Sequence, residues 1–289
     1  MIAVAMGLRR PRPIVVCWGE LLWDLLPDGP RLGGAPANAA YHAAVLGDRA
    51  ILVSRVGRDP LGDAAIAALA RAGVDVDCIQ RDDLPTGQVD VALDDGEPRF
   101  AVRAPAAWDR IAVDAAVRRA LARADAFVFG TLGRRTAAAT AALWRALDAL
   151  PAGCLRACDA NLRPPFDDLT AARQCVARAD VVKVDAAEAA RLGIVGPLPG
   201  KVVAITRGGA TATLWANGRR HDAVPPRIDP SRGDRIGAGD AYTAALVHNL
   251  LRGRPPAAAH ARAVAYAAHV AALPGGMPPM PPEAVAAAR

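Results

Sequence analysis

The sequence has 289 residues, 53% of them hydrophobic, and its 35 lysines and arginines against 29 aspartates and glutamates give a formal charge of +6. This hydrophobic content excludes a disordered chain, and no apolar run reaches the roughly 18 residues that a membrane span needs. Nucleic-acid binding is disfavoured as well, because only Lys183 and Lys201 are lysines and the other 33 basic residues are arginines scattered without interleaved aromatic residues.

The cysteines and the amino-terminal segment indicate a compartment. The five cysteines form no CxxC pair and no zinc-binding spacing, and Met1–Gly7 lacks the basic residues that begin a signal peptide. We therefore expect a reduced, cytoplasmic protein whose partners include neither a membrane nor a nucleic acid.

The first part of the chain predicts strands, helices and one β-rich insertion. Apolar runs and helical spacing predict, in order, strand 14–18, helix 35–46, strand 51–55 and helix 61–72. Alternating apolar residues on both sides of a turn at 94–98 then predict a β-hairpin over 86–103.

From about residue 110 onwards, predicted strands and helices alternate. We expect strands over 126–130, 154–158, 180–184 and 201–206, and helices over 112–123, 135–149, 168–178, 186–192, 238–252 and 256–272. An antiparallel pair, 211–216 and 219–224, turns at Asn217-Gly218. The alternation predicts an α/β fold with a doubly wound, mostly parallel sheet flanked by helices. We expect one domain over 1–289, with a small β-sheet lid built from about 20–32 and 86–103.

The strongest motif is Gly237-Ala238-Gly239-Asp240, at the start of the predicted helix 238–252. Glycines allow a tight turn and the close approach of a ligand, and the unpaired N–H groups of a helix start attract an anion such as phosphate. Asp240 serves there either as a helix cap or as a general base that accepts a proton from an attacking hydroxyl.

Four further motifs stand after predicted strands, where open α/β sheets bind ligands. Gly33-Gly34 and Asn38 lead into a helix shortly after Asp24, and together these residues suit the hydroxyls of a sugar or polyol. Asp185 and Glu188 share one helix face and either bind Mg²⁺ or cap the helix. The other two are Asp159-Ala160-Asn161-Leu162-Arg163, an Asx turn or a ligand site, and Thr206-Arg207-Gly208-Gly209, whose position suits a nucleotide.

Several other kinds of site are excluded. Gly200-Lys201 lacks the spacing of a Walker A loop, and only Gly19 follows the first strand, where a dinucleotide site has GxGxxG. The histidines form no metal-spaced cluster, and there is no GxSxG sequence, so hydrolase chemistry is unsupported.

In combination these motifs resemble the ribokinase-like (PfkB-type) carbohydrate kinases, and among them the fructokinase-like members. The resemblance covers nearly the whole chain and is carried, in the family's order, by residues 19–27, 33–38, 56–63, 159–164, 185–188 and 234–240. It implies a ribokinase-like fold, ATP and Mg²⁺ as cofactors, and transfer of the γ-phosphoryl group of ATP to a hydroxyl of a small sugar, with fructose as the leading candidate.

The resemblance also implies a role for each matching residue. Asp240 takes the hydroxyl proton, and the backbone amides of Gly237, Ala238 and Gly239 stabilise charge on the phosphoryl group. The other implied roles are sugar binding by Asp24, Gly33, Gly34, Asn38 and Arg163; nucleotide binding by Asp185, Thr206, Gly208 and Gly239; Mg²⁺ binding through water by Glu188 and Asp185; and K⁺ binding near Asp234. A homodimer formed through the β lid is implied as well.

The chain departs from the family pattern at a few positions. Arg235 stands where the family usually has threonine, which weakens the case for a monovalent cation. Asp185 replaces an asparagine, Val264 stands where many relatives carry an asparagine on the adenine side, and the stretch between Glu188 and Lys201 is short. The alternatives left open are a kinase for another small polyol or a nucleoside, and a non-catalytic sugar- or nucleotide-binding protein of the same fold.

Overall fold

The computed structural model describes residues 12–27, 29–94, 97–229 and 233–289. The segment Met1–Gly7 and the middle of the predicted turn at 94–98 lie outside the described residues. Within the described ranges, no helix is long and apolar enough to cross a membrane.

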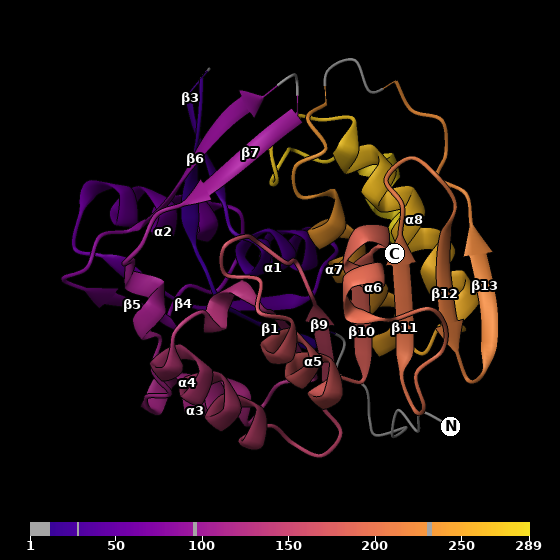
Figure 1. Ribbon diagram of the computed structural model, residues 1–289, viewed down its shortest axis with the longest axis horizontal. Coiled ribbons are helices and arrows are strands. Elements are labelled where there is room, and N and C mark those ends of the chain that lie inside the picture. Colours follow the sequence, from indigo (N-terminus) through magenta and orange to yellow (C-terminus); the bar gives the residue numbers. More distant parts are fainter. Residues whose placement is uncertain (1–11, 28, 95–96, 230–232) are drawn as a thin grey trace.

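A large sheet forms the centre of the molecule (Figure 1). Among the described residues it has nine strands in the order β13-β12-β11-β10-β9-β8-β1-β4-β5. Neighbouring strands from β5 to β11 are parallel, and β12 and β13 add to one edge in antiparallel fashion. The strands are β1 (Ile14–Trp18), β4 (Arg49–Gly57), β5 (Ile79–Asp82), β8 (Ala126–Gly130), β9 (Leu155–Asp159), β10 (Val181–Asp185), β11 (Val202–Thr206), β12 (Ala212–Ala216) and β13 (Arg219–Ala223).

Helices cover both faces of this sheet, so its central strands are buried on both sides. Along β1, Val15 and Cys17 belong to one core cluster, whereas Val16 and Trp18 belong to the other, as the period of two in a strand requires. The first core includes residues of α1 (Ala35–Val45), α2 (Pro60–Arg71), α7 (Ala238–Leu251), α8 (Pro256–Ala271) and α9 (Pro282–Ala288). The second includes residues of α3 (Ala115–Leu121), α4 (Ala137–Asp148), α5 (Leu169–Arg178) and α6 (Ala186–Leu192).

A second, small sheet stands over one end of the large one, at the upper left of Figure 1. Its strand order is β3-β2-β6-β7, in which β2 and β6 are parallel and the two outer pairs are antiparallel. The strands are β2 (Leu22–Leu26), β3 (Gly29–Gly33), β6 (Gly87–Asp94) and β7 (Glu97–Val102). Together the two sheets confirm the predicted fold class.

The structure also contains elements that the sequence patterns did not predict. Three of the four residues of the short edge strand β5 are polar, and α9 begins at Pro282 within a proline-rich stretch, so neither shows a clear periodicity. The 3₁₀ turns η1 (Ala107–Arg110) and η2 (Leu132–Arg134) were likewise not predicted. Helix α3 starts later than expected, because the Asp114 side chain accepts the Val117 N–H and caps it at that point.

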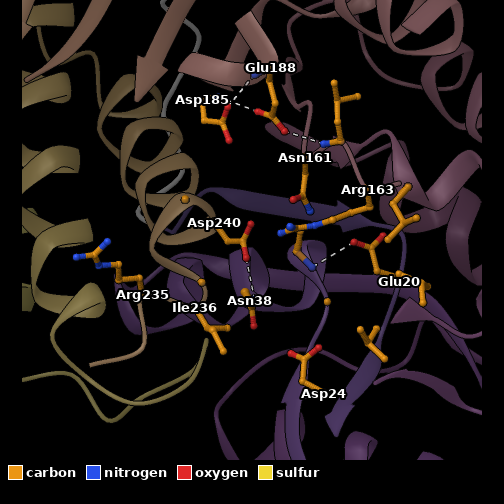
Figure 2. Close-up of a pocket in the computed structure, with 18 of the residues that line it drawn as sticks. Glu20, Asp24, Asn38, Asn161, Arg163, Asp185, Glu188, Arg235, Ile236 and Asp240 are labelled. Atoms are coloured by element: carbon orange, nitrogen blue, oxygen red, sulfur yellow. Dashed lines mark hydrogen bonds between the residues drawn. The ribbon is translucent and has the colours of Figure 1, made fainter. Parts of the chain in front are cut away.

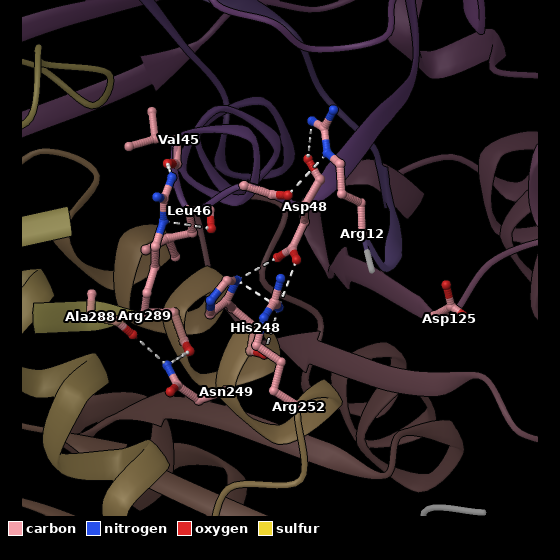
Figure 3. A network of polar contacts seen from close by, with 12 residues as sticks. Arg12, Val45, Leu46, Asp48, Asp125, His248, Asn249, Arg252, Ala288 and Arg289 are labelled. Atoms are coloured by element: carbon pink, nitrogen blue, oxygen red, sulfur yellow. Dashed lines mark hydrogen bonds and ion pairs between the residues drawn. The ribbon is translucent and has the colours of Figure 1, made fainter. Parts of the chain in front are cut away.

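A buried polar network ties the carboxyl-terminal ends of α1 and α7 together (Figure 3). Asp48 accepts hydrogen bonds from His248 and from Arg252, at 2.8 Å each, and its side chain is fully buried. Asn249 donates to the carbonyl of Ala288, and Arg289 donates to the carbonyl of Leu46. The chain terminus is therefore fastened to the end of the molecule where α1 and α7 finish.

Candidate active site

A cavity of about 630 Å³ opens at the carboxyl ends of the central strands. The chain adds β4 on one side of β1 and β8 on the other, and such a switch in sheet order is where open α/β folds bind ligands. The small sheet lines part of the cavity through Leu22, Asp24 and Val89. The predicted site residues that line it are Asp24, Gly34, Asn38, Arg163, Asp185, Glu188, Asp234, Gly237, Gly239 and Asp240.

Asp240 lies in the first turn of α7 and faces the cavity (Figure 2). Asn38 of α1 donates from its Nδ2 to Asp240 Oδ2 at 2.7 Å, which orients the carboxylate. Burial raises the pKa of Asp240 to about 7, and the nearby Asp159 carboxylate adds to this rise. A carboxylate with such a pKa is suited to accept a proton near neutral pH.

Two helix starts converge on this point. Helix α1 follows Gly34 (φ +105°) and α7 follows Gly237 (φ +74°), and neither of these glycines has a side chain that could cap its helix. A Cβ atom on Gly237 would lie 2.5 Å from Gly276 Cα, so the two loops are packed backbone against backbone. In α1 the Ala35 N–H is already bonded to Glu20 Oε1 and Pro36 has no N–H, so the first N–H groups of α7, at its positive dipole end, are the ones available to an anion.

A buried lysine lies beneath the start of α7. Lys183 of β10 donates to Asp159 Oδ1 at 3.0 Å, and both side chains are at most 10% exposed. A Cβ atom on Gly239 would lie 2.7 Å from Lys183 Nζ, which places the ammonium group directly against the glycine motif. Burial opposes the charge of Lys183, but the carboxylates of Asp159, Glu188 and Asp240 outweigh it and raise the pKa. Lys183 therefore brings a permanent positive charge to the cavity.

Acidic groups gather at the end of the cavity nearest the small sheet. Burial raises the pKa of Asp24 to about 6, whereas the Arg163 guanidinium opposes the rise. Burial likewise raises the pKa of Glu20 to about 7, and Glu20 Oε1 accepts the Ala35 N–H at 3.2 Å while its buried Oε2 has no hydrogen-bond partner in the protein. These carboxyl groups supply fixed acceptors for ligand hydroxyls.

Asp185 and Glu188 form a capping box at the start of α6. Each side chain accepts the other residue's backbone N–H at 2.8 Å, and Glu188 Oε1 also accepts the Leu162 N–H at 2.7 Å. Glu188 thereby holds the loop that carries Arg163. Carboxylate oxygens keep further acceptor capacity, so the pair fits a Mg²⁺ ion held through water and phosphate. In the described residues, no group of three or more His, Cys, Asp or Glu side chains forms an all-protein metal site.

Asp234 lines the cavity, but its carboxylate already has protein partners. Oδ1 accepts the Ile236 N–H at 3.0 Å, and Oδ2 accepts the Gly275 N–H at 2.8 Å. Arg31 of β3 also donates to Oδ2. Because the Arg31 guanidinium already balances the charge of this carboxylate and would repel a second cation beside it, the arrangement does not fit a monovalent cation bound to Asp234.

The structure places the remaining predicted residues next to the cavity rather than on its wall. Thr206 ends β11 and pairs in register with Asp185, and Gly208 follows it with a φ of +57°. Gly33 packs against Asp24, since a Cβ atom there would lie 2.3 Å from Asp24 Oδ2. Ala238 donates its N–H to the Arg235 carbonyl at 3.4 Å.

Sequence reasoning assigned no role to Lys183 or Glu20, although both line the cavity. A detectable signal existed for Lys183, because a lysine within the otherwise apolar run Val181–Val184 needs a buried partner. Glu20 directly follows β1, at the strand end where ligands bind, but nothing local indicated that it would be only 2% exposed.

Comparisons with known proteins point to one family. The family model described as pfkB family carbohydrate kinase matches residues 30–283. A Pyrococcus horikoshii protein named as a sugar kinase is 29% identical over 254 residues, which cover 81% of each chain. An Arabidopsis thaliana protein with the name "Probable fructokinase-3" is 28% identical over 271 residues, covering 82% of this chain and 78% of its own.

The fold agrees with a solved structure as well. The crystal structure of an uncharacterized sugar kinase from Pyrococcus horikoshii in complex with ATP superposes with a TM-score of 0.78 and 25% identity, over 91% of this chain and 95% of that one. This likeness confirms the ribokinase-like architecture. Because the family model spans most of the sequence, the chain belongs to the pfkB family of carbohydrate kinases and is an ATP-dependent carbohydrate kinase.

Proposed function

We propose that this kinase transfers the γ-phosphoryl group of ATP to a hydroxyl of a small sugar, with fructose as the first candidate. The observation that carries the proposal is the contact between Asn38 and Asp240, at 2.7 Å, beside the start of α7. This contact holds the Asp240 carboxylate, whose pKa is raised, beside the start of α7, which suits a phosphate. The relative named fructokinase-3 supports fructose within this class.

In the proposed reaction Asp240 accepts the proton of the attacking sugar hydroxyl. The N–H groups of Gly237, Ala238 and Gly239 donate to the oxygens of the transferred phosphoryl group, for which Ala238 releases its weak bond to Arg235. The ammonium group of Lys183 adds positive charge under the same glycines. Phosphoryl transfer depends mainly on such positioning and charge stabilisation.

We assign the two ends of the cavity to the two substrates. The sugar lies between the small sheet and Asp240, where Asp24, Gly34, Asn38 and Arg163 contact its hydroxyls and Gly33 leaves room for Asp24. The nucleotide lies toward β10 and β11, near Asp185, Thr206 and Gly208. Mg²⁺ bound with ATP supplies charge neutralisation of the phosphates, and Glu188 and Asp185 hold its water molecules.

We also propose a single domain over 1–289, in which the small sheet acts as a lid and contacts a second copy of the chain. Strands β3 and β7 are the edges of that sheet in the described part of the chain, and an edge strand can pair with another molecule. Light scattering on the purified protein tests for the dimer.

The five cysteines are buried free thiols, which supports a reduced, cytoplasmic location.

The test of function is ADP release from ATP and Mg²⁺ with a panel of ketohexoses, aldoses, small polyols and nucleosides. We expect fructose to give the highest kcat/KM, and Asp240→Asn to lower kcat roughly 10²–10⁴-fold, because the general base is lost. Asp83→Asn is the matched control, since that side chain is 96% exposed. Turnover of no sugar, or an Asp240→Asn variant as fast as the parent, would contradict the proposal. If a nucleoside gave a higher kcat/KM than fructose, the nucleoside would replace fructose as the proposed substrate.

A further inference from the structure

The carboxylate of Asp234 joins three segments of the chain just before α7. It accepts the Ile236 N–H within its own loop, the Gly275 N–H from the loop after α8, and a charged hydrogen bond from Arg31 of β3. Each of its two oxygens therefore has a protein partner, and its negative charge is balanced by a guanidinium group from the small sheet.

The two loops that Asp234 joins carry the phosphate-binding part of the site. Gly237 follows Ile236 directly and packs against Gly276, where a Cβ atom would lie 2.5 Å from Gly276 Cα. Gly276 in turn packs against the Asn38 amide, since a Cβ atom on Gly276 would lie 2.6 Å from Asn38 Oδ1. A displacement of Asp234 would thus move both the anion-binding turn and the side chain that orients Asp240.

Arg31 reaches this point from the same hairpin that carries Asp24. The two residues are directly opposite in the β2–β3 pair, so both side chains leave the same face of the small sheet. The Arg31 side chain also lies along the second loop, because a Cβ atom on Gly275 would be 3.6 Å from Arg31 Cδ. One cation thus connects the β2–β3 hairpin, which bears Asp24, with both loops near the start of α7.

We propose that Arg31 is a built-in cation that positions the anion-binding turn, and that the kinase therefore needs no monovalent metal ion for activity. This inference rests on the proposed function. An arginine is always charged and its forked donors hold a fixed geometry, so it can balance Asp234 permanently and without a binding equilibrium. Arg31 is a positioning residue, because it acts through Asp234 and the two loops.

The first test compares cations in the unmodified protein. Turnover, ADP affinity by calorimetry and the midpoint of thermal unfolding are measured in KCl and in tetramethylammonium chloride at equal ionic strength. We expect kcat and the ADP Kd to differ by less than about twofold, because the guanidinium is present in both salts. Stimulation of kcat by K⁺ of about tenfold or more would overturn the proposal.

The second test removes the side chain. In tetramethylammonium chloride, we expect Arg31→Ala to lower kcat by about 10- to 100-fold through misplacement of the turn, with a smaller change in the KM for sugar. KCl or low guanidinium chloride restores part of this loss, and Arg31→Lys retains an intermediate kcat. The matched control is Arg81→Ala, whose side chain is 30% exposed and paired with Asp63, against 29% for Arg31. The control should show no dependence on the cation.

Two results with the variants would contradict the inference. The first is that Arg31→Ala keeps the parent's kcat in tetramethylammonium chloride. The second is that Arg31→Ala loses kcat and neither K⁺ nor guanidinium restores it, because lost packing alone would then explain the lower kcat. If Arg31→Ala does not fold, the same comparison of kcat in the two salts is made with Arg31→Gln and Arg31→Lys. If the unmodified protein phosphorylates no sugar, the proposed function fails, but the cation dependence of ADP affinity in the parent and the variants still decides whether Arg31 replaces a bound cation.

Discussion

Lys183 shows how one side chain sets the chemistry of this cavity. Its side chain projects from a buried strand toward the side of the sheet that α7 covers. There Lys183 pairs with Asp159, and Thr243 donates to Asp159 Oδ2 at 2.8 Å. The ion pair is buried, so each charge depends on the other. The positive charge also opposes the rise in the pKa of Asp240.

We therefore predict that Lys183→Met changes the pH dependence of kcat/KM. Loss of the positive charge raises the pKa of Asp240 further, so the base stays protonated to a higher pH. The acidic limb of the profile, expected near pH 7 in the parent, should move upward by about one pH unit or more. Lys201→Met is the control, because Lys201 donates to the carbonyls of Ala177 and Ala179 rather than to a carboxylate of the cavity. A limb that stays in place or moves to lower pH would refute the assignment.

The uncapped start of helix α7 depends on a glycine. Its first turn carries Asp240, and Gly237 adopts a positive φ immediately before it. By contrast, α6 begins with the side-chain cap of Asp185, which satisfies its first N–H groups internally. The difference between a capped and an uncapped start separates a helix that is merely anchored from one that can bind an anion.

We predict that Gly237→Ala both destabilises the protein and slows catalysis. A positive φ strains any residue with a Cβ atom, and here that atom would meet the backbone of Gly276 at 2.5 Å, so we expect a loss of about 1–3 kcal/mol in the free energy of unfolding. We expect kcat to fall by about tenfold or more, because the N–H donors move. Urea unfolding and steady-state kinetics measure the two effects. Gly153→Ala is the control, with no atom within 4 Å of the added Cβ, and an equal loss in both variants would refute the explanation.

In the molecule as a whole, the cavity and the Asp48 network lie at opposite ends of α1 and α7. Helices α1 and α7 both start at the cavity, with Asn38 and Asp240 in contact there. Both finish at the opposite end, where the buried Asp48 accepts hydrogen bonds from His248 and from Arg252 (Figure 3). Changes at the far end should thus affect stability more than the reaction.

We predict that Asp48→Ala lowers the free energy of unfolding by about 1–3 kcal/mol, because it leaves the buried His248 ring and the partly buried Arg252 without their hydrogen-bond acceptor. The KM values and kcat of the folded fraction should change little. The control is Asp148→Ala, whose side chain is 65% exposed in a surface ion pair with Arg178 and should cost less than about 1 kcal/mol. A loss of kcat in folded Asp48→Ala would show that the two ends are coupled.

Most of the fold could be predicted from local patterns. The alternation of apolar runs with helical spacing identified every parallel strand of the described large sheet except β5, whose residues Ile79–Asp82 show no periodicity. The glycine motif and Asp240 were found because the geometry of a helix start requires those residue types within a few positions. The capping box of Asp185 and Glu188 follows from their spacing, and the structure contains it.

Contacts between distant segments required the folded chain. Arg31 meets Asp234 across 203 positions, and Asn38 meets Asp240 across 202, and no periodicity or motif encodes such a pairing. The strand pattern predicted burial for the run that holds Lys183 but left its partner undetermined, because Asp159 lies on a different strand that only the sheet order makes a neighbour. Local propensity and spacing act within a few residues, whereas charge compensation and burial depend on which surfaces the packed sheet and helices bring together.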